Sequence, residues 1–443
     1  MIDQKIFKSY DVRGIYPEEL TEEAAYAIGR AFARTVGVQE IALGSDMRIS
    51  GPALREQLIA GITDEGADVV DFGLVPIDLI YFATSRLGFQ AGVMITASHN
   101  PKEYNGFKMV RADALMISGE AILQAVKQLP TESSEKKGVV KQRDAWAEYI
   151  DHVLTFVDVK KIKPFRVVVD AGNGMAGKVI PQLEKYLPIT VVPMNFELDG
   201  NFPAHPSNPL LPESQAGIAA EIKKQNADFG VIFDGDTDRL IFLDETGQFI
   251  QADITLLILA KEFLRREPGA GIVYNAVCSR AVPEFVEKMG GRPIRSRVGY
   301  FFVTQAMRAE KGIMGGELSS HYSFRDNSFA DSGFIAFLIL LQLLSQDGRP
   351  LSAIASEYQV YHKAPENNLE IADKEAVIAK VKRQYGDGKQ DELDGLTVEY
   401  KDWWFNVRPS NTEPLLRVTV EAAVKELLEE KSSELTAFIN RNR

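Results

Sequence analysis

Residues 228–239 read Asp228-Phe-Gly-Val-Ile-Phe-Asp-Gly-Asp-Thr-Asp-Arg239. The first half is a short apolar run typical of a buried strand, and the second half places carboxylates at alternate positions. Asp234, Asp236 and Asp238 offer hard oxygen ligands, which suit Mg²⁺ or Ca²⁺ rather than zinc. The segment therefore predicts a strand that ends at a metal-binding loop.

Two other interpretations of this acidic loop stay open from the motif alone. An EF-hand is one of them, because Glu245 falls at its twelfth position, but an EF-hand also needs glycine where this chain has Arg239 and a helix on each side. The other is a solvated acidic turn without metal, although carboxylates this close repel one another unless a cation or Arg239 offsets them. A metal site is the favoured interpretation.

A strand followed by a polar loop occurs three times along the chain. These strands are predicted at 91–95, 228–233 and 311–315, with loops at 96–101, 234–239 and 316–321. Other strands are predicted at 41–46, 167–172 and 271–276, each followed by a helix and a second strand near Val69, Val191 or Pro293. This rhythm favours parallel sheets covered by helices. Because ligands gather beyond the carboxyl ends of parallel strands, the loops are expected to share one cleft.

The length of 443 residues predicts roughly three domains, with four smaller ones as the alternative. The last part of the chain reads differently, because predicted helices at 374–385 and 422–440 flank a strand at 395–400. It is therefore expected to form a separate α+β domain. Linkers are predicted at 130–142, 247–252 and 346–350.

Charge and composition exclude several classes of protein. The net charge of -12 argues against bulk attraction to nucleic acid or to an anionic membrane. The apolar run 334–344 is shorter than the ~20 residues that span a bilayer, so a buried helix is expected there. The single cysteine, Cys278, excludes an internal disulfide, and the N-terminus lacks a signal-peptide core. A cytoplasmic location is expected.

Ser98 stands in the loop Thr96-Ala-Ser-His-Asn-Pro101, directly after a predicted strand. A hydroxyl in that place can be presented at the rim of a sheet as a nucleophile. A serine hydrolase is disfavoured, because adjacent residues such as Ser98 and His99 rarely face each other and no glycine-framed nucleophile elbow is present. Without the metal loop, a turn-forming serine would be the better interpretation.

Two further loops carry binding chemistry. Glu317, Ser319 and His321 alternate along one segment, so their side chains could share a face and contact sugar hydroxyls, although a surface edge strand is the alternative. The segment Arg408-Pro-Ser-Asn-Thr-Glu413 gathers a guanidinium, hydroxyls and an amide in one turn. That chemistry suits a bound phosphate, and the alternative is an ordinary polar turn.

Taken together and in this order, these loops resemble the α-D-phosphohexomutase superfamily, specifically its bacterial phosphomannomutase/phosphoglucomutase group. The resemblance covers essentially the whole chain and includes Tyr10–Gly14, Tyr104–Lys108 and Asp199–Pro203. It implies an α/β fold with three related mixed or parallel α/β domains plus a C-terminal α+β domain, heart-shaped with a central cleft. The expected domains are 1–140 with the phosphoserine loop, 141–248 with the metal loop, 249–355 with the sugar-recognition loop and 356–443 with the phosphate-binding loop.

The resemblance also implies roles for residues. Ser98 would carry the phosphoryl group, and Mg²⁺ would be held by Asp234, Asp236, Asp238 and an oxygen of phospho-Ser98. The residues implied around the reacting phosphoryl group are Arg13, Arg239 and Lys108, with Lys108 as general acid/base and His99 as a second candidate. The residues implied in substrate binding are Glu317, Ser319 and His321 for the sugar, Arg408, Ser410, Asn411 and Thr412 for the phosphate, and Tyr10 for a hydroxyl contact.

The activity implied is reversible 1,6-phosphoryl transfer on mannose and glucose phosphates. A hexose 1,6-bisphosphate would serve as intermediate and activator, with small-molecule hexose phosphates as partners. Neither nucleic acid nor membrane is expected as a partner, and the chain is expected to be a monomer or weak homodimer. One alternative is a phosphoglucosamine mutase, which Leu318 disfavours because that relative typically has glutamine there. A metal-dependent phosphatase is another alternative.

Several positions depart from the pattern of the superfamily. Ser45 replaces a common arginine, Val277 a basic residue, Tyr300 a frequent histidine and Ser320 a common glycine. Loss of basic contacts at Val277 and Tyr300 would weaken affinity or change substrate preference, unless Arg280, Arg295 or Arg297 compensates. These departures keep open a catalytically weak sugar-phosphate-binding protein as the third alternative.

Overall fold

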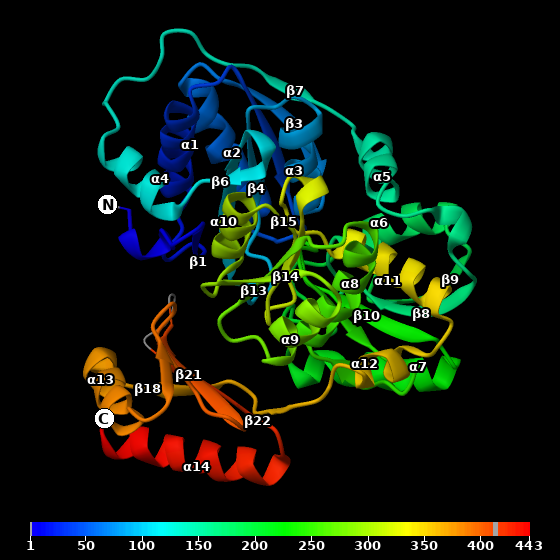
Figure 1. Ribbon diagram of the computed structural model, residues 1–443. Coiled ribbons are helices and arrows are strands. Elements are labelled where there is room, and N and C mark those ends of the chain that lie inside the picture. The colour runs from blue at the N-terminus through cyan, green and yellow to red at the C-terminus, as the bar shows by residue number, and fades with distance from the viewer. Residues whose placement is uncertain (1, 411–414) are drawn as a thin grey trace. The chain divides into compact units, whose positions relative to one another are not determined.

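The computed structural model (Figure 1) describes residues 2–410 and 415–443. The chain forms two compact units. The first unit comprises Met1–Ile250 and Ser319–Ser352, and the second comprises Gln251–Leu318 and Ala353–Arg443. The predicted fold class is confirmed: three mixed α/β sheets precede an antiparallel C-terminal sheet. The four domain boundaries stay a prediction.

The first sheet of the first unit has the strand order β1-β5-β4-β2-β3-β7, with β6 beside β5. Strands β2, β3, β4 and β7 are parallel, whereas β5 is antiparallel to β4 and to β1. Its strands are β1 (Val12–Ile15), β2 (Glu40–Ser45), β3 (Asp68–Leu74), β4 (Ala91–Ile95), β5 (Tyr104–Arg111), β6 (Leu115–Met116) and β7 (Val140–Gln142). The prediction of a linker at 130–142 is wrong for its last three residues, because these form β7, which pairs with β3 at the edge of the sheet.

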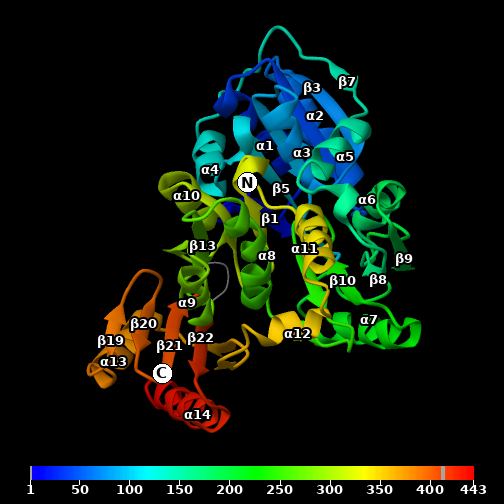
Figure 2. The same cartoon turned by 45° about the vertical axis from the view of Figure 1, so that its right-hand side comes forward.

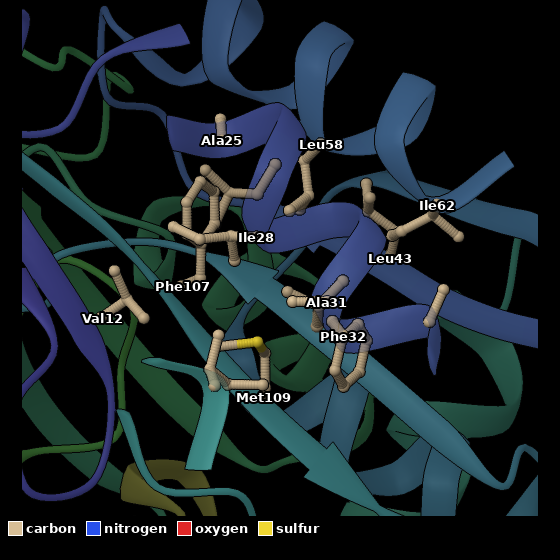
Figure 3. Close-up of a cluster of buried hydrophobic side chains, with 14 of the residues drawn as sticks. Val12, Ala25, Ile28, Ala31, Phe32, Leu43, Leu58, Ile62, Phe107 and Met109 are labelled. Atoms are coloured by element: carbon tan, nitrogen blue, oxygen red, sulfur yellow. The ribbon is translucent and has the colours of Figure 1, made fainter. Parts of the chain in front are cut away.

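Helices of this region are α1 (Glu22–Val36), α2 (Gly51–Asp64), α3 (Ile77–Arg86) and α4 (Gly119–Lys127). The backbones of α1 and α2 approach closely at two glycines: a Cβ on Gly29 would lie 2.4 Å from the Leu58 carbonyl oxygen, and one on Gly61 would lie 2.1 Å from that of Tyr26. Glycine is required there because any side chain would separate the helices. Figure 3 shows apolar side chains of both helices packed against strand side chains such as those of Phe107 and Met109. Together these side chains form the core.

A second sheet of the first unit has the order β12-β11-β10-β8-β9, in which β8, β9 and β10 are parallel. Its strands are β8 (Phe165–Asp170), β9 (Ile189–Met194), β10 (Phe229–Phe233), β11 (Leu240–Leu243) and β12 (Phe249–Ile250), and the nearby helices are α5 (Trp146–Leu154), α6 (Ala176–Leu183), α7 (Pro212–Gln225) and α11 (Gly333–Asp347). Helix α11 confirms the buried helix expected at 334–344, and its Phe334 stacks on Phe233 of β10 with ring centroids 4.8 Å apart. The first unit also contains β16 (Tyr322–Phe324).

The second unit contains three parallel strands and a separate antiparallel sheet. Strand β13 (Gly271–Asn275) lies between β14 (Arg292–Ser296) and β15 (Gly312–Gly316), with helices α8 (Ala252–Arg266), α9 (Ala281–Lys288) and α10 (Tyr300–Glu310). The antiparallel sheet consists of β17 (His362–Lys363), β18 (Asn367–Glu370), β19 (Lys389–Asp391), β20 (Leu396–Glu399), β21 (Trp403–Pro409) and β22 (Leu415–Ala422). Helix α14 (Lys425–Arg441) packs along β22 (Figure 2), and α13 (Lys374–Gln384) completes this part.

Some predicted boundaries are corrected by strand pairing. The linker predicted at 247–252 holds β12, which pairs with β11, and α8 already begins at Ala252. The helix predicted at 422–440 begins only at Lys425, because Ala422 belongs to β22 and pairs with Trp403. The linker predicted at 346–350 separates α11 from α12 (Leu351–Ser356), apart from two residues of α11. Short 3-10 helices lie at Gln4–Ile6, Ala112–Ala114, Val159–Lys161, Glu184–Tyr186 and Arg325–Asn327.

The helices that the structure describes include none with the length and hydropathy needed to cross a membrane. The longest, α14, is amphipathic and places Leu428, Leu435 and Ile439 against the C-terminal sheet. Its exposed face carries glutamates.

His205, in the loop before α7, should make the stability of the folded chain depend on pH. Nε2 of His205 lies 3.2 Å from an Asp170 carboxylate oxygen, and Nδ1 lies 2.8 Å from the Pro206 carbonyl oxygen. Burial opposes protonation, but Asp170 outweighs it and raises the pKa of His205 above its usual 6.5. Because the folded-state pKa is the higher one, the added stability is fully present below about pH 6.5 and is lost as pH rises through the folded-state pKa. His205→Gln should therefore lower the melting temperature more at about pH 5.5 than at about pH 8.5.

His152 provides the matched control for this measurement. It stacks on Phe82 and lies 2.9 Å from the Asn327 side-chain oxygen, and burial lowers its pKa. His152→Gln should therefore show the opposite trend, with the larger loss at the higher pH. A His205→Gln loss that does not change with pH would contradict the assignment of the Asp170 ion pair.

Candidate active site

The predicted metal loop joins β10 to β11 in the first unit. Asp234, Asp236 and Asp238 are all buried, and one potential ligand atom from each lies within 4.8 Å of the others. The loop is held by Asp234 Oδ1, which accepts the backbone N–H groups of Thr237 at 3.1 Å and of Arg239 at 3.2 Å. Antiparallel strands flank the loop, so the EF-hand alternative is wrong, and its burial is unlike a solvated turn.

Lys108 places a cation among these carboxylates. It lies on β5, its Nζ donates to Asp236 Oδ2 at 2.7 Å, and it also donates to Asp238 Oδ2. Burial and the neighbouring Asp238 and Asp236 raise the pKa of Asp234 well above its usual value. Burial also acts to raise the pKa of Asp238, but Lys108 and His321 reverse this and hold it well below the usual range. The loop thus concentrates negative charge that a cation can offset.

The donor set fits a hard divalent cation. Oδ1 of Asp236 is buried and has no hydrogen-bond partner among the described residues. An oxygen left in this way is costly unless another group, such as a cation, binds to it. Three carboxylates close to a hydroxyl form the oxygen-rich set that Mg²⁺ prefers.

Ser98 meets the carboxylate loop. It follows β4, and its left-handed backbone, with φ of 51°, is uncommon for a residue other than glycine. Ser98 Oγ donates to Asp234 Oδ2 at 2.6 Å, and its backbone N–H donates to the Thr96 hydroxyl at 2.9 Å. The predicted nucleophile and the predicted metal loop, far apart in sequence, are therefore in direct contact.

Basic groups surround Ser98. Arg13 on β1 donates to the Asn100 side-chain oxygen at 2.6 Å and pairs with Asp11. Nε of Arg239 lies 3.8 Å from Asp234 Oδ2. Nδ1 of His99 lies 3.3 Å from Ser98 Oγ, and burial with the nearby charges of Arg239 and Arg13 lowers the pKa of His99 well below its usual value. His99 is therefore neutral at physiological pH.

Two residues of the predicted sugar loop also lie in the first unit. Ser319 Oγ lies 2.9 Å from His321 Nδ1, and His321 Nε2 lies 3.3 Å from Asp238 Oδ1. Asp331 is buried 3.8 Å from the same Nε2. Burial and the charge of Asp238 raise the pKa of Asp331. His321 therefore joins the predicted sugar loop to the metal loop.

Tyr10, the residue predicted to add a hydroxyl contact, precedes β1 and is partly buried.

The other predicted binding residues belong to the second unit. Glu317 is buried and accepts the Asn275 amide at 3.1 Å and the Gly299 N–H at 2.7 Å. Arg408 on β21 pairs with Glu366 at 3.0 Å. The Ser410 N–H donates to the Leu415 carbonyl oxygen, whereas Asn411 and Thr412 lie outside the described residues.

The arginines considered as replacements near Val277 have protein partners in the second unit. Arg280 donates to the carbonyl oxygens of Lys401 and Tyr400 at 2.9 Å, and Arg295 donates to the Thr397 hydroxyl at 3.0 Å. Arg297 lies over the Phe302 ring. A role for any of them in compensation stays a prediction.

Sequence reasoning missed several buried polar residues around Ser98. They are Asp46, Arg48, Thr96 and Ser207, all in the first unit. Thr96 Oγ1 donates to Asp46 Oδ2 at 2.6 Å, and Ser207 Oγ donates to the Ser98 carbonyl oxygen at 3.1 Å. Asp46 and Arg48 directly follow the carboxyl end of β2, so the rule that identified the other loops would also have found them.

Four domain models of one family match successive parts of the chain. They are described as phosphoglucomutase/phosphomannomutase alpha/beta/alpha domains I, II and III and the C-terminal domain, and they match residues 4–136, 147–247, 251–361 and 366–436. A curated relative from Xanthomonas campestris pv. campestris, described as phosphohexose mutases, is 39% identical over 441 residues and 98% of each chain. A phosphomannomutase from Escherichia coli is 37% identical over 449 residues, again 98% of each chain.

A solved structure agrees with these relatives. The crystal structure of a phosphoglucomutase/phosphomannomutase family protein from Burkholderia thailandensis has a TM-score of 0.90 and 32% identity, covering 100% of this chain and 98% of that one. The matches place the molecule among the phosphohexomutases, which are isomerases, as the resemblance to the α-D-phosphohexomutase superfamily predicted. The chain belongs to the phosphoglucomutase/phosphomannomutase family.

Proposed function

We propose that the chain interconverts the 1-phosphates and 6-phosphates of mannose and glucose through a phosphoserine at Ser98. The contact that supports this proposal best is the 2.6 Å hydrogen bond from Ser98 Oγ to Asp234 Oδ2. It brings a hydroxyl nucleophile to a buried cluster of carboxylates, which is the arrangement that metal-assisted phosphoryl transfer needs. A hexose 1,6-bisphosphate is the proposed intermediate and activator.

The proposed metal ligands are Asp234, Asp236, Asp238 and an oxygen of phospho-Ser98, and Mg²⁺ is the proposed ion. When bound, the ion supplies positive charge that offsets the transferring phosphoryl group. Arg13 and Arg239 are proposed to bind phosphoryl oxygens, for which guanidinium groups are well shaped.

Lys108 is proposed as the general acid/base: its neutral amine would accept the proton of the sugar hydroxyl, and the ammonium formed would return a proton in the reverse step. Its two carboxylate partners, Asp236 and Asp238, keep the ammonium in place beside the Ser98 loop. His99 is the second candidate, because its Nδ1 lies 3.3 Å from Ser98 Oγ.

The proposed substrate contacts follow the sequence prediction. Glu317, Ser319 and His321 would bind sugar hydroxyls, and Tyr10 would add a further contact. The residues proposed for the non-reacting phosphate are Arg408, Ser410, Asn411 and Thr412. The cytoplasmic location and the state of monomer or weak homodimer also stay predictions.

The test is a conversion assay with Mg²⁺ and the matching hexose 1,6-bisphosphate. Mannose 1-phosphate, glucose 1-phosphate and glucosamine 1-phosphate are supplied separately, and the 6-phosphate product and free phosphate are both measured. Mannose and glucose 6-phosphates should form faster than glucosamine 6-phosphate, without steady phosphate release. Fastest turnover of the glucosamine substrate would identify a phosphoglucosamine mutase, steady phosphate release a phosphatase, and binding without turnover the weak binder.

A further inference from the structure

Arg48 lies behind the Ser98 loop, and its side chain is fully buried, with 0% of it exposed. It follows β2 and donates hydrogen bonds to four backbone carbonyl oxygens of one segment. Nη2 donates to the oxygens of Ser98 and Asn100 at 2.7 Å each, and Nη1 donates to those of Pro101 at 2.8 Å and Tyr104 at 2.9 Å. One guanidinium therefore binds the segment from Ser98 to Tyr104 along its length.

This pattern requires arginine. Ser98 is buried, and residues 98–101 do not belong to a strand, so its carbonyl group needs a donor from outside the strand hydrogen bonds of the sheet. A guanidinium carries five N–H donors in a rigid plane, whereas a lysine ammonium carries three and acts as a compact charge. Lysine at position 48 therefore keeps the charge but leaves part of the loop without its donors.

The guanidinium of Arg48 also has a carboxylate and an aromatic ring as neighbours. Its Nε lies 3.4 Å from Asp46 Oδ2, and its guanidinium lies over the Phe202 ring, 5.1 Å from the centroid. Asp46 in turn accepts the Thr96 hydroxyl at 2.6 Å, and Thr96 accepts the backbone N–H of Ser98. Arg48 and Asp46 thus hold the Ser98 loop from both its carbonyl and its N–H groups.

The conformation of Ser98 explains why such support is needed. A left-handed φ of 51° costs free energy in a serine and persists only where surrounding contacts impose it. The Ser98 carbonyl oxygen accepts two donors, Arg48 Nη2 and Ser207 Oγ, which fix the peptide plane that follows Ser98. With the backbone fixed, Oγ points to Asp234.

We infer that Arg48 is a positioning residue for phosphoryl transfer, which holds Ser98 so that its Oγ meets the Asp234–Asp238 loop. Its side chain is fully buried and its hydrogen bonds go to backbone carbonyl oxygens, so it acts through the backbone of the Ser98 loop. The inference rests on the proposed function and deepens it. It predicts that weakening this contact slows the transfer step and leaves substrate binding intact.

The experiment compares Arg48→Lys with Arg30→Lys. Arg30 is also a buried arginine of the first unit, but it donates to Glu65 and to the Glu132 carbonyl oxygen, away from Ser98. Because a misplacement of about 1 Å can cost about 10²-fold in rate, Arg48→Lys should lower kcat by about 10²-fold. KM should change by less than about threefold, and single-turnover phosphorylation of Ser98 by hexose 1,6-bisphosphate should slow as much as kcat. Arg30→Lys should keep the wild-type kcat.

Ser207→Ala keeps the inference testable if Arg48→Lys does not fold. It removes the second donor to the Ser98 carbonyl oxygen with little change in volume, and kcat should fall by about 3- to 10-fold at unchanged KM. A wild-type kcat in folded Arg48→Lys overturns the inference, and so does a rise in KM that accounts for the whole loss. If Arg48→Lys is unfolded, a wild-type kcat in Ser207→Ala overturns it. A wild-type enzyme without conversion instead contradicts the proposed function, so the two failures are distinguishable.

Discussion

Ser98→Ala is expected to lower kcat by at least about 10³-fold and to remove the phosphoryl group from the protein, since loss of a covalent nucleophile in a serine protease costs about 10⁶-fold. The physical reason is that the Ser98 hydroxyl is the group hydrogen-bonded to Asp234. Alanine at position 98 has no oxygen to accept the phosphoryl group. Steady-state conversion of hexose 1-phosphates and intact-protein mass spectrometry measure the two effects.

The control for this variant is Ser356→Ala. Ser356 is exposed on α12, and its hydroxyl donates to the Ala353 carbonyl oxygen of its own helix. That variant should keep both the wild-type kcat and the added phosphoryl mass. Wild-type turnover in Ser98→Ala would rule out a phosphoserine mechanism, and a phosphoryl group retained on Ser98→Ala would assign the nucleophile to another residue.

Asp234→Asn is expected to separate stability from activity. Its folded-state pKa lies well above the ordinary value, because burial and the carboxylates of Asp238 and Asp236 disfavour its charge. A carboxyl with a raised folded-state pKa destabilises the folded protein once pH exceeds the unfolded value of about 3.9. At neutral pH the amide removes this repulsion, so the metal-free variant should melt no lower than the metal-free wild type.

The same substitution should remove the response to magnesium. At about 100 times its Kd, a ligand of the folded state adds about 2.7 kcal/mol to the unfolding free energy. We expect a gain of this order for the wild type and a much smaller one for Asp234→Asn, together with a loss of kcat of about 10²-fold or more. Thermal melts with and without Mg²⁺ measure the first effect, and the conversion assay measures the second.

Asp158→Asn is the control for the magnesium experiment. Asp158 is exposed and pairs with Lys161, so its substitution should leave both the magnesium-dependent stabilisation and kcat unchanged. An Asp234→Asn protein that gains as much stability from Mg²⁺ as the wild type would show that Asp234 is not a ligand. A variant less stable than the wild type without metal would contradict the assigned repulsion.

The sequence alone determined the fold class and the loops that carry chemistry. Each β/α unit can be recognised from a short stretch of sequence, because its apolar run, its helical periodicity and the polar residues after its strand lie near one another in the chain. That is why the strands at 91–95 and 229–233, and the acidic loop that follows the second, could be located without a structure. It is also why residues in those loops were identified as candidates.

Only the tertiary structure decided which of these groups meet. The hydrogen bond of Ser98 to Asp234, the ion pairs of Lys108 with Asp236 and Asp238, and the proximity of His321 to Asp238 all join segments far apart in the chain. Burial, and with it the opposite pKa directions of Asp234 and Asp238, depends on these contacts rather than on residue type.

Arg48 is the clearest example of a residue whose contacts are decided only by the tertiary structure. In the sequence its place after a predicted strand makes it a candidate, but no local pattern indicates that it is buried or which groups it binds. In the folded chain it binds four carbonyl groups of a loop that begins fifty positions later, at Ser98. Local sequence determines the elements and the chemistry available at their ends, whereas long-range packing determines which buried donor meets which acceptor, because that pairing exists only after the sheets have formed.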